Sequence, residues 1–147
     1  MSLSERLNDD MKQAMRDKDK LKLATIRMIR SSVKYLEIDF KRPLEESEVL
    51  DVISREIKQR KDSLQEFEKA GRDDLVTDLA TEIEIISAYL PEQLTEEEIQ
   101  EIVRQTIHEL GASSKADMGK VMGALLPKTK GRAESKLVNQ FVQQYLQ

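Results

Sequence analysis

Residues 47–90 read SEVLDVISREIKQRKDSLQEFEKAGRDDLVTDLATEIEIISAYL, and the architecture of the chain follows from this stretch. Apolar residues recur in it at spacings of three and four, the period of an amphipathic helix. They are Leu50, Ile53, Ile57, Leu64 and Phe67 in the first half, and Val76, Leu79, Ile83, Ile86 and Leu90 in the second. The spacing predicts one helix over about residues 47–70 and a second helix that Pro91 stops.

Gly71 separates the two predicted helices. Glycine readily adopts the left-handed conformation found just after a helix, and Asp73 or Asp74 can cap the helix that follows. Because the connection is short, the two helices should lie antiparallel. Arg60 departs from the pattern, since it stands in the seam of the first helix where another apolar residue is expected.

The preceding residues predict two further helices. Ser2 and Glu5 form a capping-box pattern at the start of the first, and Pro43 ends the region of the second. The apolar residues are Leu3, Leu7, Met11 and Met15 in the first helix, and Leu21, Ala24, Met28, Val33 and Leu36 in the second. The other side of the second helix carries a cationic stripe of Lys20, Arg27, Arg30 and Lys34. With the long pair, these helices predict a four-helix subdomain over residues 1–90.

Three shorter helices are predicted after Pro91. Thr95 and Glu98 form a second capping-box pattern, Gly111 ends the helix that follows, and Ser113 or Ser114 can cap the next. The apolar positions are Ile99, Ile102, Val103 and Leu110, then Met118, Val121, Met122 and Leu125, and finally Leu137, Val138, Phe141 and Tyr145. The sequence therefore predicts an all-α chain, with the four-helix subdomain followed by a three-helix subdomain over residues 91–147.

Composition agrees with a soluble helical protein. The chain has 147 residues, of which 39% are hydrophobic, and only three are proline and five glycine. It has no cysteine, which excludes disulfides, zinc–thiolate sites and cysteine nucleophiles. Its first residues form no apolar signal region, and no apolar run approaches the roughly 18 residues of a membrane span. We therefore expect a cytoplasmic protein that makes no contact with a membrane.

Charge is distributed unevenly. The chain has a net charge of −4, yet residues 111–147, the basic tail, have a net charge of +4. Pro127 and Gly131 mark a predicted turn from which Lys128, Lys130 and Arg132 project, and such a cluster of cations is typical of an anion site. The residues expected to contact phosphate are Lys120, Lys128, Lys130, Arg132 and Lys136. The ordinary alternative is a solvated loop in which Gly131 serves only as the turn residue.

The sequence shows no convincing catalytic constellation. It has no nucleotide-binding glycine loop and no set of metal ligands, and its one histidine, His108, falls on the solvent face of a predicted helix. Ser113, Ser114 and Lys115 resemble a fragment of a serine–lysine amidase site, but helix capping explains both serines. We therefore expect no catalytic residues, no metal and no cofactor, and incline to a protein that is not an enzyme.

Two stretches resemble the GatB/YqeY family, and the similarity is close to free-standing bacterial YqeY proteins over essentially the whole chain. The first is Arg55-Glu56-Ile57-Lys58-Gln59-Arg60-Lys61-Asp62-Ser63, with Phe67, Gly71-Arg72, Leu75 and Tyr89-Leu90-Pro91-Glu92-Gln93-Leu94 after it. The second is Ala116-Asp117-Met118-Gly119-Lys120-Val121-Met122, followed by Lys130-Gly131-Arg132-Ala133 and Leu137-Val138-Asn139. The second stretch is similar to the tail of the B subunit of tRNA-dependent amidotransferases.

The resemblance implies an all-helical fold and a role beside tRNA. In the amidotransferases, which form glutaminyl-tRNA or asparaginyl-tRNA, the tail helps to hold the tRNA while other parts do the chemistry. The first hypothesis is therefore an accessory protein that binds RNA, namely tRNA, through the basic tail. The cationic stripe of Lys20, Arg27, Arg30 and Lys34 is the competing RNA site. The second is an adaptor that docks on an amidotransferase or an aminoacyl-tRNA synthetase through Arg60, Lys61 and Arg72. The third is the family-level carbon–nitrogen ligase activity with glutamine as amido donor.

The purified chain should neither hydrolyse glutamine nor consume ATP, because the sequence contains no nucleophile–base pair, metal set or phosphate loop. Assays of ammonia and phosphate release, run beside a mock preparation, test this expectation. Turnover above the mock level that disappears in a His108→Ala or Ser114→Ala variant would contradict it.

Overall fold

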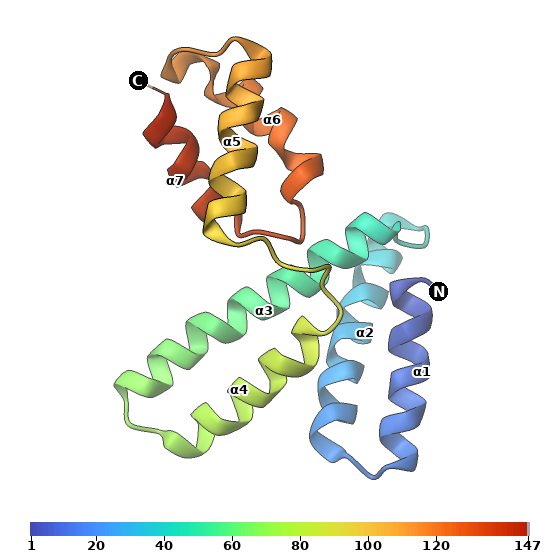
Figure 1. Cartoon of the computed structure of the whole chain (residues 1–147). Helices are drawn as coiled ribbons and strands as arrows, with labels where there is room; N and C mark the ends of the chain where they lie inside the picture. Colours follow the sequence, from blue (N-terminus) through green and yellow to red (C-terminus); the bar gives the residue numbers. More distant parts are fainter. Residues whose placement is uncertain (147) are drawn as a thin grey trace. The chain divides into compact units, whose positions relative to one another are not determined.

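The computed structural model describes residues 1–146, and over this range it contains seven α-helices, one short 3-10 helix and no strand (Figure 1). The prediction of an all-α chain with four helices followed by three is therefore confirmed. The α-helices are α1 (Leu3–Arg16), α2 (Lys20–Phe40), α3 (Glu46–Lys69), α4 (Asp73–Ser87), α5 (Glu96–Leu110), α6 (Met118–Thr129) and α7 (Ser135–Tyr145). The 3-10 helix η1 (Lys115–Asp117) leads directly into α6.

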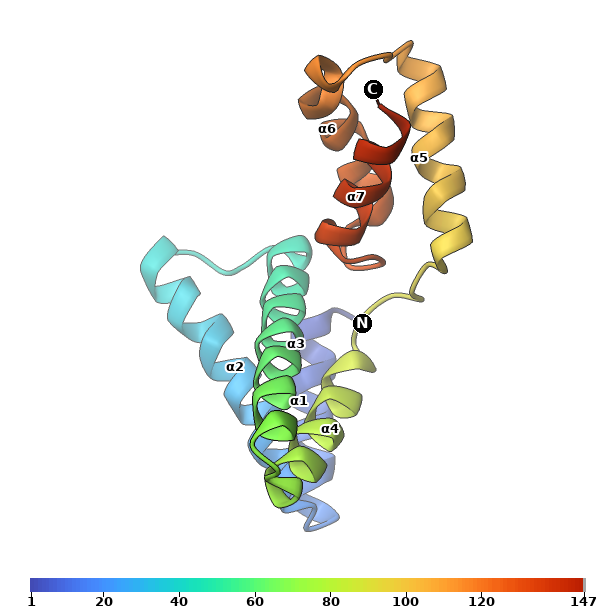
Figure 2. The same ribbon diagram turned by 90° about the vertical axis from the view of Figure 1, so that its left-hand side faces the viewer.

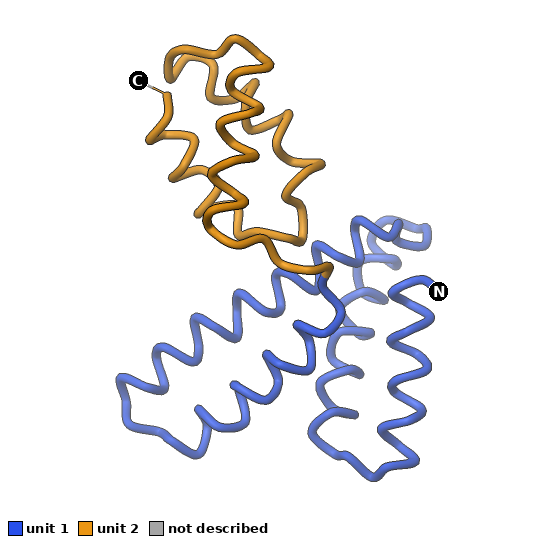
Figure 3. Tube along the Cα trace, viewed as in Figure 1, with its two compact units in different colours: residues 1–90 blue, residues 91–147 orange. Residues whose placement is uncertain are grey.

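The chain divides into two compact units, coloured separately in Figure 3. Unit 1 is Met1–Leu90 and unit 2 is Pro91–Gln147. Each has its own apolar core. Fully buried side chains in unit 1 include Leu7, Ile26, Ile29, Ile53 and Ile86. Those in unit 2 include Ile99, Val103, Val121, Leu125, Val138 and Val142.

In unit 1, α3 and α4 form the antiparallel pair that the sequence predicts (Figure 1). Gly71 has a φ of +70° and lies just after the helix end, as expected. The predicted capping of α4 by Asp73 or Asp74 is wrong, because Arg72 occupies the N-cap position and no side chain there bonds to the backbone. Asp73 and Asp74 instead lie in the first turn of α4, where carboxylates interact favourably with the helix dipole.

The buried face of α2 also differs from the prediction. Ala24 and Met28 were expected to face the core, but both are exposed. The residues that α2 buries are Thr25, Ile26, Ile29 and Val33. Apolar residues lie on both faces of this helix, so periodicity alone did not identify the side that packs against α1 and α3.

Arg60 lies inside unit 1, with 7% of its surface exposed. Its Nη1 lies 2.5 Å from Oε2 of Glu56 on the same helix, and its Nε lies 3.7 Å from Oε1 of Glu82 on α4. Its Nη2 lies 2.9 Å from the sulfur of Met28 on α2. Ser32 of α2 also donates to Glu56, over 3.0 Å. Arg60 therefore links α3 to both of its neighbours, which explains why a cation stands in the seam.

Replacing Arg60 with Met should destabilise unit 1 by about 3–5 kcal/mol, because it leaves the half-buried Glu56 and Glu82 without their cation. Urea unfolding followed by circular dichroism measures the loss. The matched control is Arg72→Met, since Arg72 makes only an exposed ion pair with Asp74 and its loss should cost less than about 1 kcal/mol. Equal effects of the two substitutions would show that the Arg60 contacts contribute no more than a surface pair.

In unit 2, the predicted capping box at α5 is confirmed, since the Thr95 hydroxyl accepts from the backbone N–H of Glu98, whose carboxylate accepts from that of Thr95. Gly111 ends α5 with a φ of +63°. The predicted serine cap of the next helix is wrong, because Ser114 makes no capping bond and precedes η1. The predicted turn does not open at Pro127, because α6 continues through this residue to Thr129; the turn follows at Gly131, whose φ is +74°.

Candidate functional site

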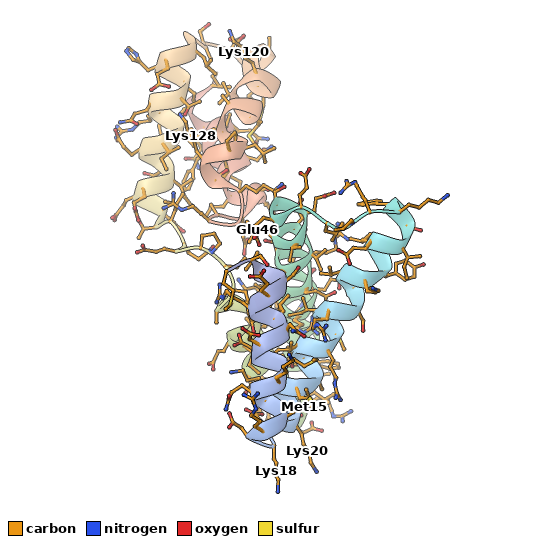
Figure 4. The ribbon with its side chains drawn as sticks, turned by 90° about the vertical axis from the view of Figure 1, so that its right-hand side faces the viewer. Met15, Lys18, Lys20, Glu46, Lys120 and Lys128 are labelled. Carbon is orange, nitrogen blue, oxygen red and sulfur yellow. The ribbon has the colours of Figure 1, made fainter. Side chains whose placement is uncertain are left out.

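The five cations predicted to bind phosphate lie on α6, α7 and the turn between them. Lys120 is in the first turn of α6, and Lys128 is in its last turn, about 12 Å further along the axis. Figure 4 shows these two side chains at different levels of unit 2. Lys130 and Arg132 belong to the turn, and Lys136 lies in the first turn of α7. The structure thus gathers four of the five at one end of α6 and leaves Lys120 at the other.

Lys128 does not project freely from a turn. Its Nζ donates to the hydroxyl of the buried Thr106, over 3.0 Å, and lies 3.7 Å from a carboxylate oxygen of Glu109. Both partners belong to α5. The Lys128 side chain is still 42% exposed, so its ammonium group can reach a further anion from its place against α5.

The turn after α6 is fastened to the residues that precede α5. The Nε of Arg132 donates to the carbonyl of Glu92 over 3.2 Å, and the Arg132 carbonyl accepts from the N–H of Leu94 over 2.8 Å. The Gln93 amide donates to the carbonyl of Gly131 over 2.7 Å. These bonds hold the turn in one conformation, contrary to the expectation of a connection from which three cations project.

Carboxylates lie beside this turn. Hydrogen bonds from Thr95 hold the pKa of Glu98 below its usual value, and the nearby charge of Arg132 lowers that pKa further. Glu96 and Glu97 belong to the same first turn of α5. The net charge of −5 on residues 91–110 therefore offsets the basic tail within one unit, and unit 2 as a whole has a net charge of −1. Any anion site here depends on local geometry, because the unit has no positive charge overall.

A second group of cations lies in unit 1, where the sequence predicted a stripe on α2. Arg27, Arg30 and Lys34 line a groove of about 510 Å³ together with residues of α1 that include Leu7 and Met11. We call this the α1–α2 groove. The fourth predicted member, Lys20, lies at the first residue of α2 and does not line it. Spacing at about 100° per residue was sufficient to identify the three that do.

In α2, four large apolar side chains are exposed. The sequence analysis assigned no role to Tyr35, Ile38 and Phe40, and it expected Met28 to face the core. Tyr35 is 71% exposed, Ile38 68% and Met28 51%. A signal for them was present, because at about 100° per residue Tyr35 and Ile38 fall on the same side of α2 as Lys34, away from the buried Ile26 and Ile29. The exposed side of α2 is therefore both cationic and apolar.

The residues that could carry metal chemistry, and those singled out in the sequence, lie apart in the described part of the chain. Over residues 1–146, no three His, Cys, Asp or Glu side chains gather where they could hold a metal ion. His108 lies exposed in the last turn of α5, and the N–H of Ser113 donates to Asp117 over 3.1 Å at the start of η1. None of the described helices combines the length and hydropathy of a bilayer span.

By its fold, the chain is a small all-α protein with two helical units, and cations are exposed on both units. Residues 4–146 match the family described as Yqey-like protein. The chain belongs to this family, which confirms the resemblance seen in its motifs.

Curated relatives of the chain are fungal proteins. One, from Pyrenophora tritici-repentis, is named altered inheritance of mitochondria protein 41, mitochondrial, and is 34% identical over 95% of this chain and 78% of the relative. A protein of the same name from Saccharomyces cerevisiae is 33% identical over 95% of this chain and 80% of its own length. Another, from Kluyveromyces lactis, is 46% identical over 56% of this chain and 45% of its own length.

These names contradict the prediction of a cytoplasmic location, because the relatives are mitochondrial proteins. The prediction rested on the lack of cysteine and of an apolar signal region. Neither feature distinguishes the cytoplasm from the mitochondrion.

Proposed function

We propose that this chain is an accessory protein that binds tRNA and does no chemistry of its own. The observation that carries the proposal is that Lys120, Lys128 and Lys136 remain exposed on α6 and α7 after folding. This is the part of the chain that resembles the tail of the amidotransferase B subunit, where the tail helps to hold the tRNA. Lysine and arginine contacts to phosphate supply most of the affinity in such binding.

The five cations should contribute unequally. Arg132 is bonded to a backbone carbonyl and lies near Glu98, and Lys128 shares its ammonium group with Thr106 and Glu109. An anion that approaches either of them competes with carboxylates. Lys120 and Lys136 are exposed, and no ion pair joins either to another residue described by the structure. We therefore expect these two lysines to make the larger contribution.

The second candidate function is an adaptor that docks on an amidotransferase or an aminoacyl-tRNA synthetase. Arg60 is excluded as an interface residue because it is buried and paired inside unit 1. Arg72 and Lys61 are exposed, but the specific observation that favours an adaptor is the apolar surface of α2 formed by Met28, Tyr35 and Ile38. Exposed apolar side chains in a group are typical of contact with another macromolecule.

Changing Lys120 and Lys136 to Ala should reduce the magnitude of the slope of log affinity against log salt by about 1.4 to 1.8, since each lost phosphate contact removes about 0.7 to 0.9. Fluorescence anisotropy with labelled tRNA at several salt concentrations measures the slope. The matched control is Lys58→Ala with Lys69→Ala, which removes two exposed lysines from α3. The proposal predicts a smaller change in slope for this control.

The same titration with Lys128, Lys130 and Arg132 all changed to Ala tests the unequal contributions. If the cations act equally, this triple variant should lose more of the slope than the double variant. Wild-type protein that binds no tRNA even at low salt would overturn the proposed function. An unchanged slope in both variants would instead remove the basic tail as the site.

A further inference from the structure

The exposed face of α2 carries cations along one edge and an aromatic ring along the other. At about 100° per residue, Arg27 and Lys34 point within about 20° of each other and Arg30 lies about 40° beyond Lys34. Tyr35 lies about 100° away from Lys34 on the opposite edge. Ser31 stands between them, and it lines both the α1–α2 groove and a second groove, between α2 and α3, that includes Tyr35.

The three cations of the α1–α2 groove have no carboxylate partner. No ion pair joins Arg27, Arg30 or Lys34 to any residue in the described range 1–146. By contrast, three arginines of unit 1 have such partners, namely Arg42, Arg60 and Arg72. An exposed cation that no internal carboxylate neutralises is free to pair with an external anion.

Two side chains of the α1–α2 groove, Arg30 and Glu37, are held by contacts that do not change their charge. Nη1 of Arg30 lies 2.8 Å from the sulfur of Met11, a neutral and weak acceptor, which places the guanidinium group over the groove. The one acidic residue that lines the groove is Glu37, and its Oε2 accepts from the backbone N–H of Leu44 over 2.9 Å. Glu37 keeps its negative charge, so the three cations and this one carboxylate give the lining of the groove a net charge of +2.

The spacing of these cations suits a nucleic-acid strand. Arg27 and Lys34 are seven residues apart on α2, which corresponds to about 10 Å along the helix axis. Phosphates recur about every 3.4 Å of axis along one strand of a stacked duplex, and they lie further apart in an unstacked single strand. The cations of α2 can therefore contact neighbouring phosphates of one strand.

Tyr35 adds to the site an exposed aromatic ring, on which a base can stack. Its side chain is 71% exposed, and the groove between α2 and α3 begins beside it, lined by Leu36 and Val52 among others. Figure 2 shows that α2 and α3 diverge toward the C-terminal end of α2, the half of the helix that contains Tyr35. Unstacked bases of single-stranded RNA bind by stacking on exposed aromatic rings beside a basic track.

We propose that α2 binds a single-stranded segment of RNA, with Arg27, Arg30 and Lys34 on its phosphates and one base stacked on Tyr35. This proposal rests on the RNA-binding function proposed above and adds a site in unit 1. An anionic membrane surface is the competing occupant of a cationic and apolar helix face. Insertion into such a surface would use the exposed Tyr35 and Ile38, and the vesicle measurement below distinguishes that occupant from RNA.

The test uses the full chain and a labelled short oligoadenylate. Changing Arg27, Arg30 and Lys34 to Ala should reduce the magnitude of the salt slope by about 2, at about 0.7 for each single-strand contact. Tyr35→Leu should weaken binding roughly 5- to 150-fold while leaving the slope unchanged, because it removes stacking and no charge. The matched control changes three exposed lysines elsewhere in unit 1, Lys12, Lys58 and Lys69, and should change the slope less.

Several outcomes separate this site from the proposed function. If wild-type protein binds tRNA but both α2 variants bind the oligoadenylate as wild type does, the α2 site is wrong and the tRNA-binding function survives. If wild-type protein binds neither RNA, both fail. If it binds phosphatidylserine vesicles through the three cations but not the oligoadenylate, the face is a lipid site and this proposal is overturned. Unchanged far-UV circular dichroism of each variant confirms that binding was measured on folded protein.

Discussion

The buried guanidinium group of Arg60 is the constraint on which the arrangement of unit 1 depends. A charge removed from water is costly unless it is paired, and Arg60 meets this cost with Glu56 at 2.5 Å and Glu82 at 3.7 Å. The longer distance leaves Nε of Arg60 without a hydrogen bond, so the pairing is incomplete. An apolar seam would tolerate a shift of one helix along another, whereas this charge is satisfied only where α3 and α4 bring their carboxylates to it. We infer that Arg60 fixes the register of these helices.

The same network also determines which side of α2 faces solvent. Ser32 donates to Glu56 and the sulfur of Met28 lies against Arg60, so two residues of α2 are held on α3. Side chains that are about 100° or more apart around a helix axis point toward different sides of the helix. With these two contacts and the buried Ile29 in place, Arg27 and Lys34 must point away from α3. A single structural cation in α3 thus leaves the cations of α2 available for a ligand.

Local rules predicted much of this fold, because helix ends are determined by a few neighbouring residues. The capping boxes at Ser2 and Thr95 and the left-handed glycines at 71 and 111 were all identified from sequence. Ser114 and Pro127 were misjudged: Ser114 precedes a 3-10 helix and caps no α-helix, and α6 continues through Pro127 to Thr129. The cations of the candidate site could be identified from sequence, but their partners could not. Lys128 contacts Thr106 and Glu109, and Arg132 contacts Glu92, and these partners lie in other segments of the chain.

The uneven charge of the chain determines how it can meet RNA. With a net charge of −4, the protein repels a polyanion at long range, and the attraction of its cationic surfaces is felt only within about one Debye length, roughly 8 Å at physiological salt. Association then lacks the electrostatic steering that speeds binding by uniformly basic proteins. Under the proposed function, affinity would come from contacts made after encounter, at the exposed lysines of α6 and α7 and at the cations of α2. If the proposed function holds, affinity should therefore depend steeply on salt and on the few short-range phosphate contacts, because no long-range attraction adds to them.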